Sequence, residues 1–297
     1  PSSTVVLMEI LHEAGVPDGV VNLVTGYGDP VGMAMTAHPD VDMVSFTGST
    51  AVGKAAVAAS AGNLKKVSAE LGGKNPAVVF ADADLDDAAD ALVLGAVFNA
   101  GQCCVGSSRL IVERSIAADF GAKVASLMQH LRIGDPLDEE TQIGPVINST
   151  QYDRITGYIE RGKQIARLHG TPAQAPEGTL FIIPHVFEGV SSDMDLAQDE
   201  IFGPVLSVIP FDTIEDAIEI TNGTCYGLSS SVWTNSVDNA IRMGRAIEAG
   251  TVWINTYLEG PAEVPFGGFK QSGLGRENGR TAIEEYTELK TIMFRSG

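Results

Sequence analysis

The sequence predicts an α/β protein built on parallel sheets, and three observations support this class. Short apolar runs alternate along the chain with segments of helical period about a dozen residues long, which is the pattern of strand–helix–strand units. Glycine is abundant, with 33 of the 297 residues, and aromatic residues make up only 6%, a composition that suits tight turns between strands and helices. The length permits a large buried core and, at ~150 residues per domain, roughly two domains.

The first 72 residues contain three helix patterns and three strand patterns. Helices are expected at residues 2–14, at 30–37 and, alanine-rich, from within 47–53 to about 61. Strands are expected at residues 20–24, 42–46 and 66–71. Gly15 and Pro17 are the stop signals of the first helix. Alternation in the last strand places its apolar residues on one face and Glu70 on the other.

After Gly72 and Gly73, where we place a domain boundary, the pattern repeats with longer pieces. Strands are expected at residues 76–81, 205–209 and 251–255. Helices are expected from residue 85 to about 99–101, and at 115–131, 149–168, 212–222 and 237–249. Asp212 and Glu215 have the spacing of a capping box at a helix start. Residues 172–178 are rich in proline and alanine and are expected to form a surface loop.

Charge and cysteine usage exclude several functions. The chain has 19 lysines and arginines against 38 aspartates and glutamates, a net charge of −19. Such a field repels phosphate backbones and anionic lipid, so neither nucleic acid nor a membrane is expected as a partner. Three cysteines without a CxxC pair argue against a disulfide framework and a zinc site and favour a reducing, cytoplasmic location. No histidine cluster suggests a metal, and no GxSxG a serine nucleophile.

Two segments carry residues with chemical potential. Gln102-Cys103-Cys104 follows a helix end, and adjacent cysteines in a loop are unusual because one thiol there can be solvated and reactive. The alternative is that both are small buried apolar residues, as cysteines usually are; Cys225 is interpreted in that way. Glu70 ends a strand beside two glycines, where open α/β sheets place active sites. The alternative is a solvated edge residue.

Three further segments are weaker signals. The sequence FTGST at residues 46–50, with Gly53, leaves a strand and opens a helix whose free N–H groups can bind a phosphate. A plain turn is the alternative. The sequence EIFGPV at 200–205 puts an acid and an aromatic residue ahead of a strand, and residues 265–277 are dense in glycine. The alternative interpretation of each segment is an irregular loop that connects regular elements.

Taken together and in this order, FTGST, ELGGKNP at 70–76, GQCC at 101–104, EIFGPV and the glycine-dense run through Gly279 resemble the NAD(P)-dependent aldehyde dehydrogenase superfamily. The resemblance covers essentially all 297 residues. It implies a three-layer parallel-sheet fold, with the remainder of a Rossmann-like cofactor domain (1–72), an α/β catalytic domain (73–271) and a return segment with an oligomerisation strand (272–297). A homodimer or homotetramer is implied, in which residues 286–294 join a neighbouring subunit's sheet.

The resemblance also assigns roles to individual residues. Cys104 matches the nucleophile and Glu70 the general base, while Glu277 resembles a second acid used for proton relay. The residues that match the family's cofactor site are Gly48 and Ser49 at the pyrophosphate, Glu200 at the nicotinamide ribose, and Leu71, Gly72 and Phe202 around the nicotinamide. The residues that match its substrate pocket are Cys103, Leu258 and Gly260.

The reaction implied is oxidation of an aldehyde to a carboxylic acid, with NAD as the cofactor and NADP as the alternative. A thiolate is the form that attacks; Cys104 would form a thioester that water activated by Glu70 hydrolyses. Members that pass the thioester to coenzyme A usually lack the Glu70 equivalent, so its presence favours water. The other interpretation is a truncated or non-catalytic relative with a binding or structural role.

The family's chains are longer at the amino end, where an asparagine supplies an oxyanion donor and a lysine binds the adenosine ribose. Neither has a counterpart here, so we expect a carboxyl-terminal part of an aldehyde dehydrogenase. Alone, it should show little activity, because an oxyanion donor is worth roughly 10²- to 10³-fold in rate. It should also tend to associate, because the loss of central strands exposes an unpaired sheet edge. Gly260 stands where many members carry a bulkier aromatic residue and suggests a roomier pocket. Glu259 and Glu263 would favour an amino-aldehyde.

Overall fold

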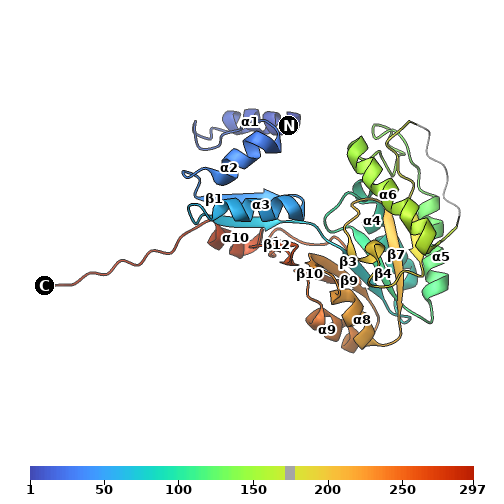
Figure 1. Cartoon of the computed structure of the whole chain (residues 1–297). Coiled ribbons are helices and arrows are strands. Elements are labelled where there is room, and N and C mark those ends of the chain that lie inside the picture. Colours follow the sequence, from blue (N-terminus) through green and yellow to red (C-terminus); the bar gives the residue numbers. More distant parts are fainter. Residues whose placement is uncertain (171–177) are drawn as a thin grey trace.

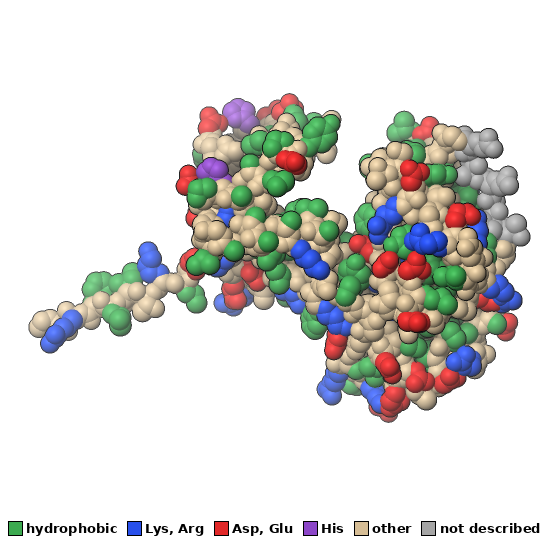
Figure 2. Space-filling model, viewed as in Figure 1, with side chains coloured by type: hydrophobic (Ala, Val, Ile, Leu, Met, Phe, Trp, Pro, Cys, Tyr) green, Lys and Arg blue, Asp and Glu red, His purple; other side chains and the backbone are tan. Residues whose placement is uncertain are grey.

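Two large sheets organise the chain in two lobes (Figure 1, Figure 2), and the described residues also form a small two-stranded sheet. The computed structural model describes residues 1–170 and 178–297. Its helices are α1 (Ser2–Glu13), η1 (Gly28–Gly32), α2 (Met33–Ala37), α3 (Thr50–Ser60), α4 (Leu85–Val97), η2 (Phe98–Gly101), α5 (Ala117–Gln129), α6 (Ser149–Ile165), α7 (Asp195–Gln198), α8 (Ile214–Asn222), α9 (Val237–Ala246) and α10 (Gly279–Glu285). Its strands are β1 (Met43–Thr47), β2 (Lys66–Glu70), β3 (Asn75–Val79), β4 (Ser107–Glu113), β5 (Arg167–Leu168), β6 (His185–Glu188), β7 (Val205–Phe211), β8 (Tyr226–Gly227), β9 (Ser229–Trp233), β10 (Thr251–Ile254), β11 (Phe269–Lys270) and β12 (Gly273–Leu274).

The smaller lobe is built on a sheet with the order β1–β2–β12. β1 and β2 are parallel, as the strand–helix–strand pattern predicts, and α3 connects them. The late strand β12 returns to this sheet and pairs antiparallel with β2, placing Gly273 opposite Glu70. Glu70 is therefore the last residue of a central strand, with Thr47 on its other side.

The larger lobe has three layers. Within the described residues its sheet has the order β10–β9–β3–β4–β7–β6–β5, and every pair except β5–β6 is parallel. Successive residues of β3 point to opposite faces: Ala77 and Val79 join the core beneath α4, α5 and α6, and Val78 joins the core beneath α8 and α9. Figure 1 shows the two helical layers on opposite sides of this sheet. The three-layer, mainly parallel α/β fold predicted from the sequence is confirmed.

Side-chain caps explain several helix starts. Asp84 caps α4 by accepting from the N–H groups of Asp86 and Asp87. The start of α8 differs from the prediction by one residue, because Thr213, not Asp212, caps the helix and pairs with Asp216 in a reciprocal capping box. A Thr hydroxyl can accept from the N3 backbone as an Asp carboxylate can, and Thr213 with Asp216 has the same three-residue spacing as Asp212 with Glu215.

Three other expectations differ from the structure or fall outside it. Residues 20–24 form no strand, since no neighbouring strand in the described part of the chain hydrogen-bonds to them. Residues 286–294 follow α10 without forming a strand and lead into the extended carboxyl end seen in Figure 1. Of the expected loop at 172–178, residues 172–177 lie outside the described residues. Among the helices described, none is both long and apolar enough to cross a membrane.

Candidate active site

Glu70 is a buried carboxyl group at the end of β2. Its side chain is 5% exposed, and neither oxygen has a hydrogen-bond partner among the described residues. Glu70 is therefore not the solvated edge residue of the alternative interpretation. Burial, reinforced by the charge of Glu277 and opposed by Arg276, raises the pKa of Glu70 to about 7. A carboxyl group with this pKa takes up and releases protons near neutral pH, as a general base must.

The glycine-dense segment encloses Glu70. A Cβ placed on Gly267 would lie 2.7 Å from Glu70 Oε1, so only a glycine leaves room for the carboxyl group there. Phe266 and Glu277 exchange backbone hydrogen bonds of 2.7 Å, which closes the loop between them. Arg276 Nη1 donates to the carbonyl groups of Gly268 and Gly275. The loop brings a second acid, Glu277, within electrostatic reach of the first.

The cysteine loop begins with an unusual run of backbone. Asn99, Ala100 and Gly101 all have positive φ angles, of 51°, 57° and 74°. A Cβ on Gly101 would lie 2.2 Å from the backbone carbon of Gly203. The chain therefore needs glycine here for its conformation and for its close approach to the 200–204 segment. This contact holds the cysteine loop against the segment that carries Glu200 and Phe202.

Asn75 fixes the cysteine loop from β3. Its Nδ2 donates to the carbonyl groups of Cys104 at 2.7 Å and Gly106 at 3.1 Å, and its Oδ1 accepts from the Ser229 N–H at 3.1 Å. One buried amide thus ties the loop to both β3 and β9. Sequence analysis missed this residue; its signal was the ELGGKNP motif, whose final residues received no role.

Cys103 and Cys104 carry adjacent half-buried thiols, whereas Cys225, expected to be buried, is exposed. Interaction between the two neighbouring thiols lowers the pKa of Cys103 and raises that of Cys104. The pair therefore loses one proton easily and holds the other. Burial and the charge of Glu70 also raise the pKa of Cys104. Glu70 and the thiol pair thus lie within electrostatic reach of one another.

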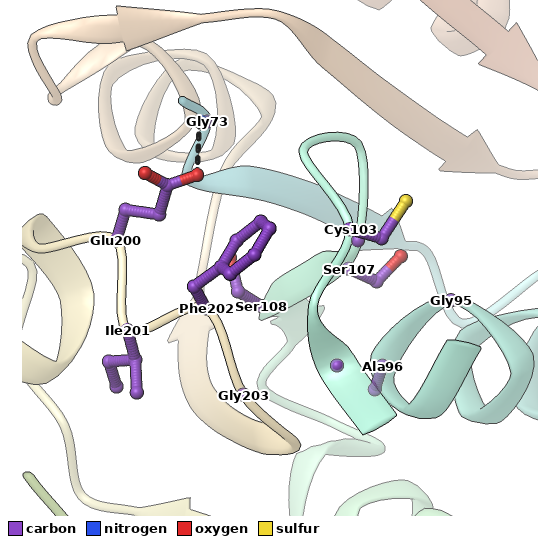
Figure 3. Close-up of a pocket in the computed structure, with 12 residues that line it drawn as sticks. Gly73, Gly95, Ala96, Cys103, Ser107, Ser108, Glu200, Ile201, Phe202 and Gly203 are labelled. Atoms are coloured by element: carbon purple, nitrogen blue, oxygen red, sulfur yellow. Dashed lines mark hydrogen bonds between the residues drawn. The ribbon is translucent and has the colours of Figure 1, made fainter. Parts of the chain in front are cut away.

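A cavity brings Cys103 together with Glu200 and Phe202 (Figure 3). Glu200 Oε1 accepts from the Gly73 N–H at 3.1 Å, and burial raises the pKa of Glu200. A Cβ on Gly72 would lie 2.2 Å from Glu200 Oε2, so the carboxylate rests directly on the glycine. Phe202, with a φ of 60°, keeps 37% of its surface exposed, and Figure 3 shows its ring between Glu200 and Cys103.

The start of α3 lies beside the strand that carries Glu70. The Gly48 N–H donates to the Glu70 carbonyl at 3.0 Å, and the exposed Ser49 caps α3 by accepting from the Val52 N–H. Leu71 is buried against this helix, since a Cβ on Gly53 would lie 2.4 Å from Leu71 Cδ2. Gly48, Ser49 and Leu71 are therefore next to one another, although none of them lines the cavity of Figure 3.

The segment at residues 256–260 contacts the cysteine loop through Tyr257. Tyr257 donates to the Val105 carbonyl at 2.9 Å and packs with both cysteines around Val105, Leu228 and Trp253. Leu258 and Gly260 are exposed, and a Cβ on Gly260 would meet nothing within 4 Å. Neither lines the cavity, so the structure brings their neighbour Tyr257, which sequence analysis missed, closer to the thiols than these two residues.

Two buried cations beneath the site were also missed. Lys74 is 1% exposed, and its Nζ has no hydrogen-bond partner in the described part of the chain. Burial and the charge of Arg109 lower the pKa of Lys74 to about 7, against the opposing charges of Asp199 and Glu200. Arg109, also 1% exposed, donates to the Lys74 carbonyl at 2.8 Å. Lys74 directly precedes β3 and Arg109 lies within β4, and the hydrophobic periodicity of the sequence does not indicate that either side chain is buried.

The architecture and the site define a three-layer α/β protein in which one cavity is lined by a cysteine, a glutamate and a phenylalanine, and a buried carboxyl group lies within electrostatic reach of the neighbouring cysteine. The chain belongs to the aldehyde dehydrogenase family: the profile described as "Aldehyde dehydrogenase family" matches residues 1–292. It is 46% identical over 300 residues to an aldehyde dehydrogenase of Emericella nidulans, covering 100% of this chain and 60% of that protein. It is 45% identical over 299 residues to human retinaldehyde dehydrogenase 3, covering 100% of this chain and 58% of that protein.

Solved structures agree with this assignment. An indole-3-acetaldehyde dehydrogenase of P. syringae, determined in complex with NAD+, superposes with a TM-score of 0.94 at 44% identity, covering 97% of this chain and 59% of that one. The chain therefore spans about 60% of the length of the curated relatives named above.

Proposed function

We propose that this chain carries the nucleophile and the general base of an NAD-dependent oxidation of an aldehyde to a carboxylic acid. The observation that carries the proposal is the proximity of Glu70 to the Cys104 thiol, close enough for the carboxylate charge to raise the pKa of that thiol. A buried carboxyl group with a pKa of about 7 beside a thiol suits acyl transfer to water.

The residues around the cavity fit a nicotinamide cofactor. Glu200 presents a half-buried carboxylate held by the Gly73 N–H, which suits the hydroxyl groups of a ribose. Gly72 has no side chain that would obstruct a cofactor beside Glu200, and Phe202 offers an exposed ring for the nicotinamide. Ser49 and Gly48 stand at the start of α3, whose N–H groups favour a phosphate. NAD+, when bound, accepts the hydride that leaves the aldehyde carbon; NADP is the alternative cofactor.

The thiols supply the covalent step. The thiolate of Cys104 adds to the carbonyl carbon of the aldehyde and gives a tetrahedral alkoxide. The oxygen that becomes an anion needs positioned donors, and the backbone N–H of Cys104 is one candidate. Loss of hydride then leaves a thioester on Cys104.

Glu70 completes the cycle by taking a proton from the water that attacks the thioester, which releases the acid and restores the thiol. Glu277, whose charge acts on Glu70, is placed to pass that proton outward. Because the thioester needs this base, we infer water and not coenzyme A as its acceptor.

The substrate pocket is assigned to Cys103, Leu258 and Gly260, with Tyr257 as its packed wall. The open space at Gly260 supports a roomy entrance. The exposed acids Glu259 and Glu263 support an amino-aldehyde substrate. Equal turnover of matched neutral and cationic aldehydes would remove this preference.

The proposal extends to organisation. A cofactor domain at residues 1–72, a catalytic domain at 73–271 and a return segment at 272–297 agree with the two sheets and with the return of β12 to the first of them. The exposed apolar side chains of Leu289, Ile292, Met293 and Phe294 support a homodimer or homotetramer. The acidic composition and the three free cysteines support a cytoplasmic location.

A second candidate function is a binding protein without catalysis. It is favoured by α1, an apolar helix that buries none of its residues and so presents a surface for a partner.

A single-turnover experiment separates the two functions. The purified chain is mixed with NAD+ and a panel of aldehydes, and NADH absorbance and intact protein mass are followed. An acyl adduct on Cys104 that accumulates in Glu70→Gln, together with NADH, supports the dehydrogenase. Labelling of Cys104 by iodoacetamide with neither adduct nor NADH overturns it and supports the binding protein.

A further inference from the structure

The helix α6 presents a polar stripe to the segment that carries Glu200 and Phe202. The stripe consists of four side chains, at spacings of three, four and three residues, that lie on one face of the helix: Gln151, Arg154, Tyr158 and Arg161. They contact residues 195–202 in reverse order along the chain. The proposed reaction uses Glu200 and Phe202 but gives no role to the stripe that holds them.

The first half of the stripe holds the backbone of this segment. Gln151 Nε2 donates to the carbonyl groups of Ile201 at 3.2 Å and Phe202 at 2.7 Å, and Arg154 Nη2 donates to the Glu200 carbonyl at 2.5 Å. Phe202 has a φ of 60°, a conformation that a bulky residue rarely adopts. These three hydrogen bonds fix the main chain, and none of them reaches the Glu200 carboxylate.

Tyr158 is the buried member of the stripe, with 8% of its surface exposed. The guanidinium groups of Arg161 and Arg154 lie over its ring, 4.4 and 5.4 Å from the centroid. Its hydroxyl donates to Asp199 Oδ2 at 2.8 Å. Because burial raises the pKa of Tyr158 to about 12, the hydroxyl keeps its proton and remains a donor at neutral pH.

The Asp199 and Glu200 side chains are held on opposite sides of one extended backbone. Asp199 has a φ of −88° and a ψ of 141°, and neighbouring side chains of an extended chain point in opposite directions. Tyr158 holds Asp199 toward α6, while Glu200 accepts from the Gly73 N–H at 3.1 Å (Figure 3). A rotation of the backbone that turned Glu200 away from Gly73 would therefore break the hydrogen bond between Tyr158 and Asp199.

We propose that Tyr158 is a positioning residue of the proposed cofactor site, which acts through Asp199 to hold the Glu200 carboxylate against Gly73 and toward the cavity. A carboxylate that already points in one direction binds the hydroxyl groups of a ribose more tightly, because it need not be ordered on binding. The effect on the cofactor rests on the proposed function of Glu200. The effect on the hydrogen bond between Glu200 and Gly73 does not.

The test compares Tyr158→Phe, which keeps the ring beneath the two guanidinium groups, with Tyr152→Phe, the matched change of a half-buried tyrosine on the same helix. Exchange of the Gly73 amide proton is followed by NMR, with the Ile111 amide in the middle of β4 as the reference for global opening. Tyr158→Phe should accelerate Gly73 exchange about fivefold relative to Ile111, as expected for the loss of one hydrogen bond of ordinary strength. Tyr152→Phe should change neither rate. Asp199→Ala should match Tyr158→Phe, and the double variant should exchange no faster than either.

Binding of NAD+ to the same variants is measured by calorimetry. Kd should rise about fivefold in Tyr158→Phe and stay the same in Tyr152→Phe. Unchanged Gly73 exchange in Tyr158→Phe, equal acceleration at Gly73 and Ile111, or the same acceleration in Tyr152→Phe would overturn the inference. Faster Gly73 exchange with unaltered or undetectable NAD+ binding supports the positioning of Glu200 and contradicts only its proposed role at the cofactor.

Discussion

Replacing Asn75 by alanine should destabilise the protein and loosen the cysteine loop. The change deletes the hydrogen bonds to the carbonyls of Cys104 and Gly106 and from the buried Ser229 N–H. At about 1 kcal/mol for each bond, the loss is ~3 kcal/mol, because all three partners are left without their acceptor or donor. We expect the free energy of unfolding to fall by that amount.

Asn63→Ala is the matched control, since its Nδ2 also donates to two carbonyl groups, those of Pro39 and Val41, but at an exposed site. Water replaces those partners, so the control should lose less than ~1 kcal/mol. Urea unfolding is followed by the fluorescence of Trp233 and Trp253, both buried. Equal midpoints for the two variants at equal m values would refute the reasoning.

Three further predictions concern charge and space at the site. Hydrolysis of the thioester should accelerate as the pH rises through about 7, because Glu70 loses its proton there. Glu70→Gln should abolish both the hydrolysis and its pH dependence, and stopped-flow mass analysis measures both. Gly72→Ala places a Cβ 2.2 Å from Glu200 Oε2, so KM for NAD should rise about tenfold, equivalent to ~1.4 kcal/mol, while KM for the aldehyde changes less. The pKa of Lys74 is lowered to about 7 from the ordinary 10.5, so between these pH values the unfolded chain binds the proton and the folded chain does not. Stability should therefore rise with pH across this window, and Lys74→Met should lose that rise in thermal unfolding; an identical pH profile would contradict the burial argument.

Local signals predicted most of the α-helices in the described residues but fewer than half of the strands there; β4, β6 and β9, for example, received no prediction. The helix α4 was predicted from its apolar spacing but ends at Val97, before the expected end at 99–101, and β1, β2 and β3 follow from short apolar runs. The expected strand at residues 20–24 failed because a strand requires a neighbour, and sequence periodicity does not indicate whether one is present. The helix α9 ends at Ala246, three residues before the predicted end, since Ile247 leaves the helical conformation.

The candidate site was predicted from ordered motifs, whereas its supporting contacts were not. Motifs indicated Glu70, Cys104 and Glu200, but the burial of Glu70 depends on the loop at residues 265–277, which is distant in sequence. Asn75 and Lys74 belong to the ELGGKNP motif, but the motif does not indicate which distant elements their side chains contact.

The short connection between β2 and β3 has a mechanical consequence. Glu70 ends the first sheet and Asn75 begins the second, with four residues between them. At roughly 3.5 Å per residue, this tether limits the separation of their Cα atoms to about 17 Å, however the two lobes move. Because Asn75 also hydrogen-bonds to the Cys104 carbonyl, the same short connection limits how far Glu70 can move from the loop that carries the Cys104 sulfur. Lengthening the tether by inserted glycines would remove that limit while leaving both sheets intact.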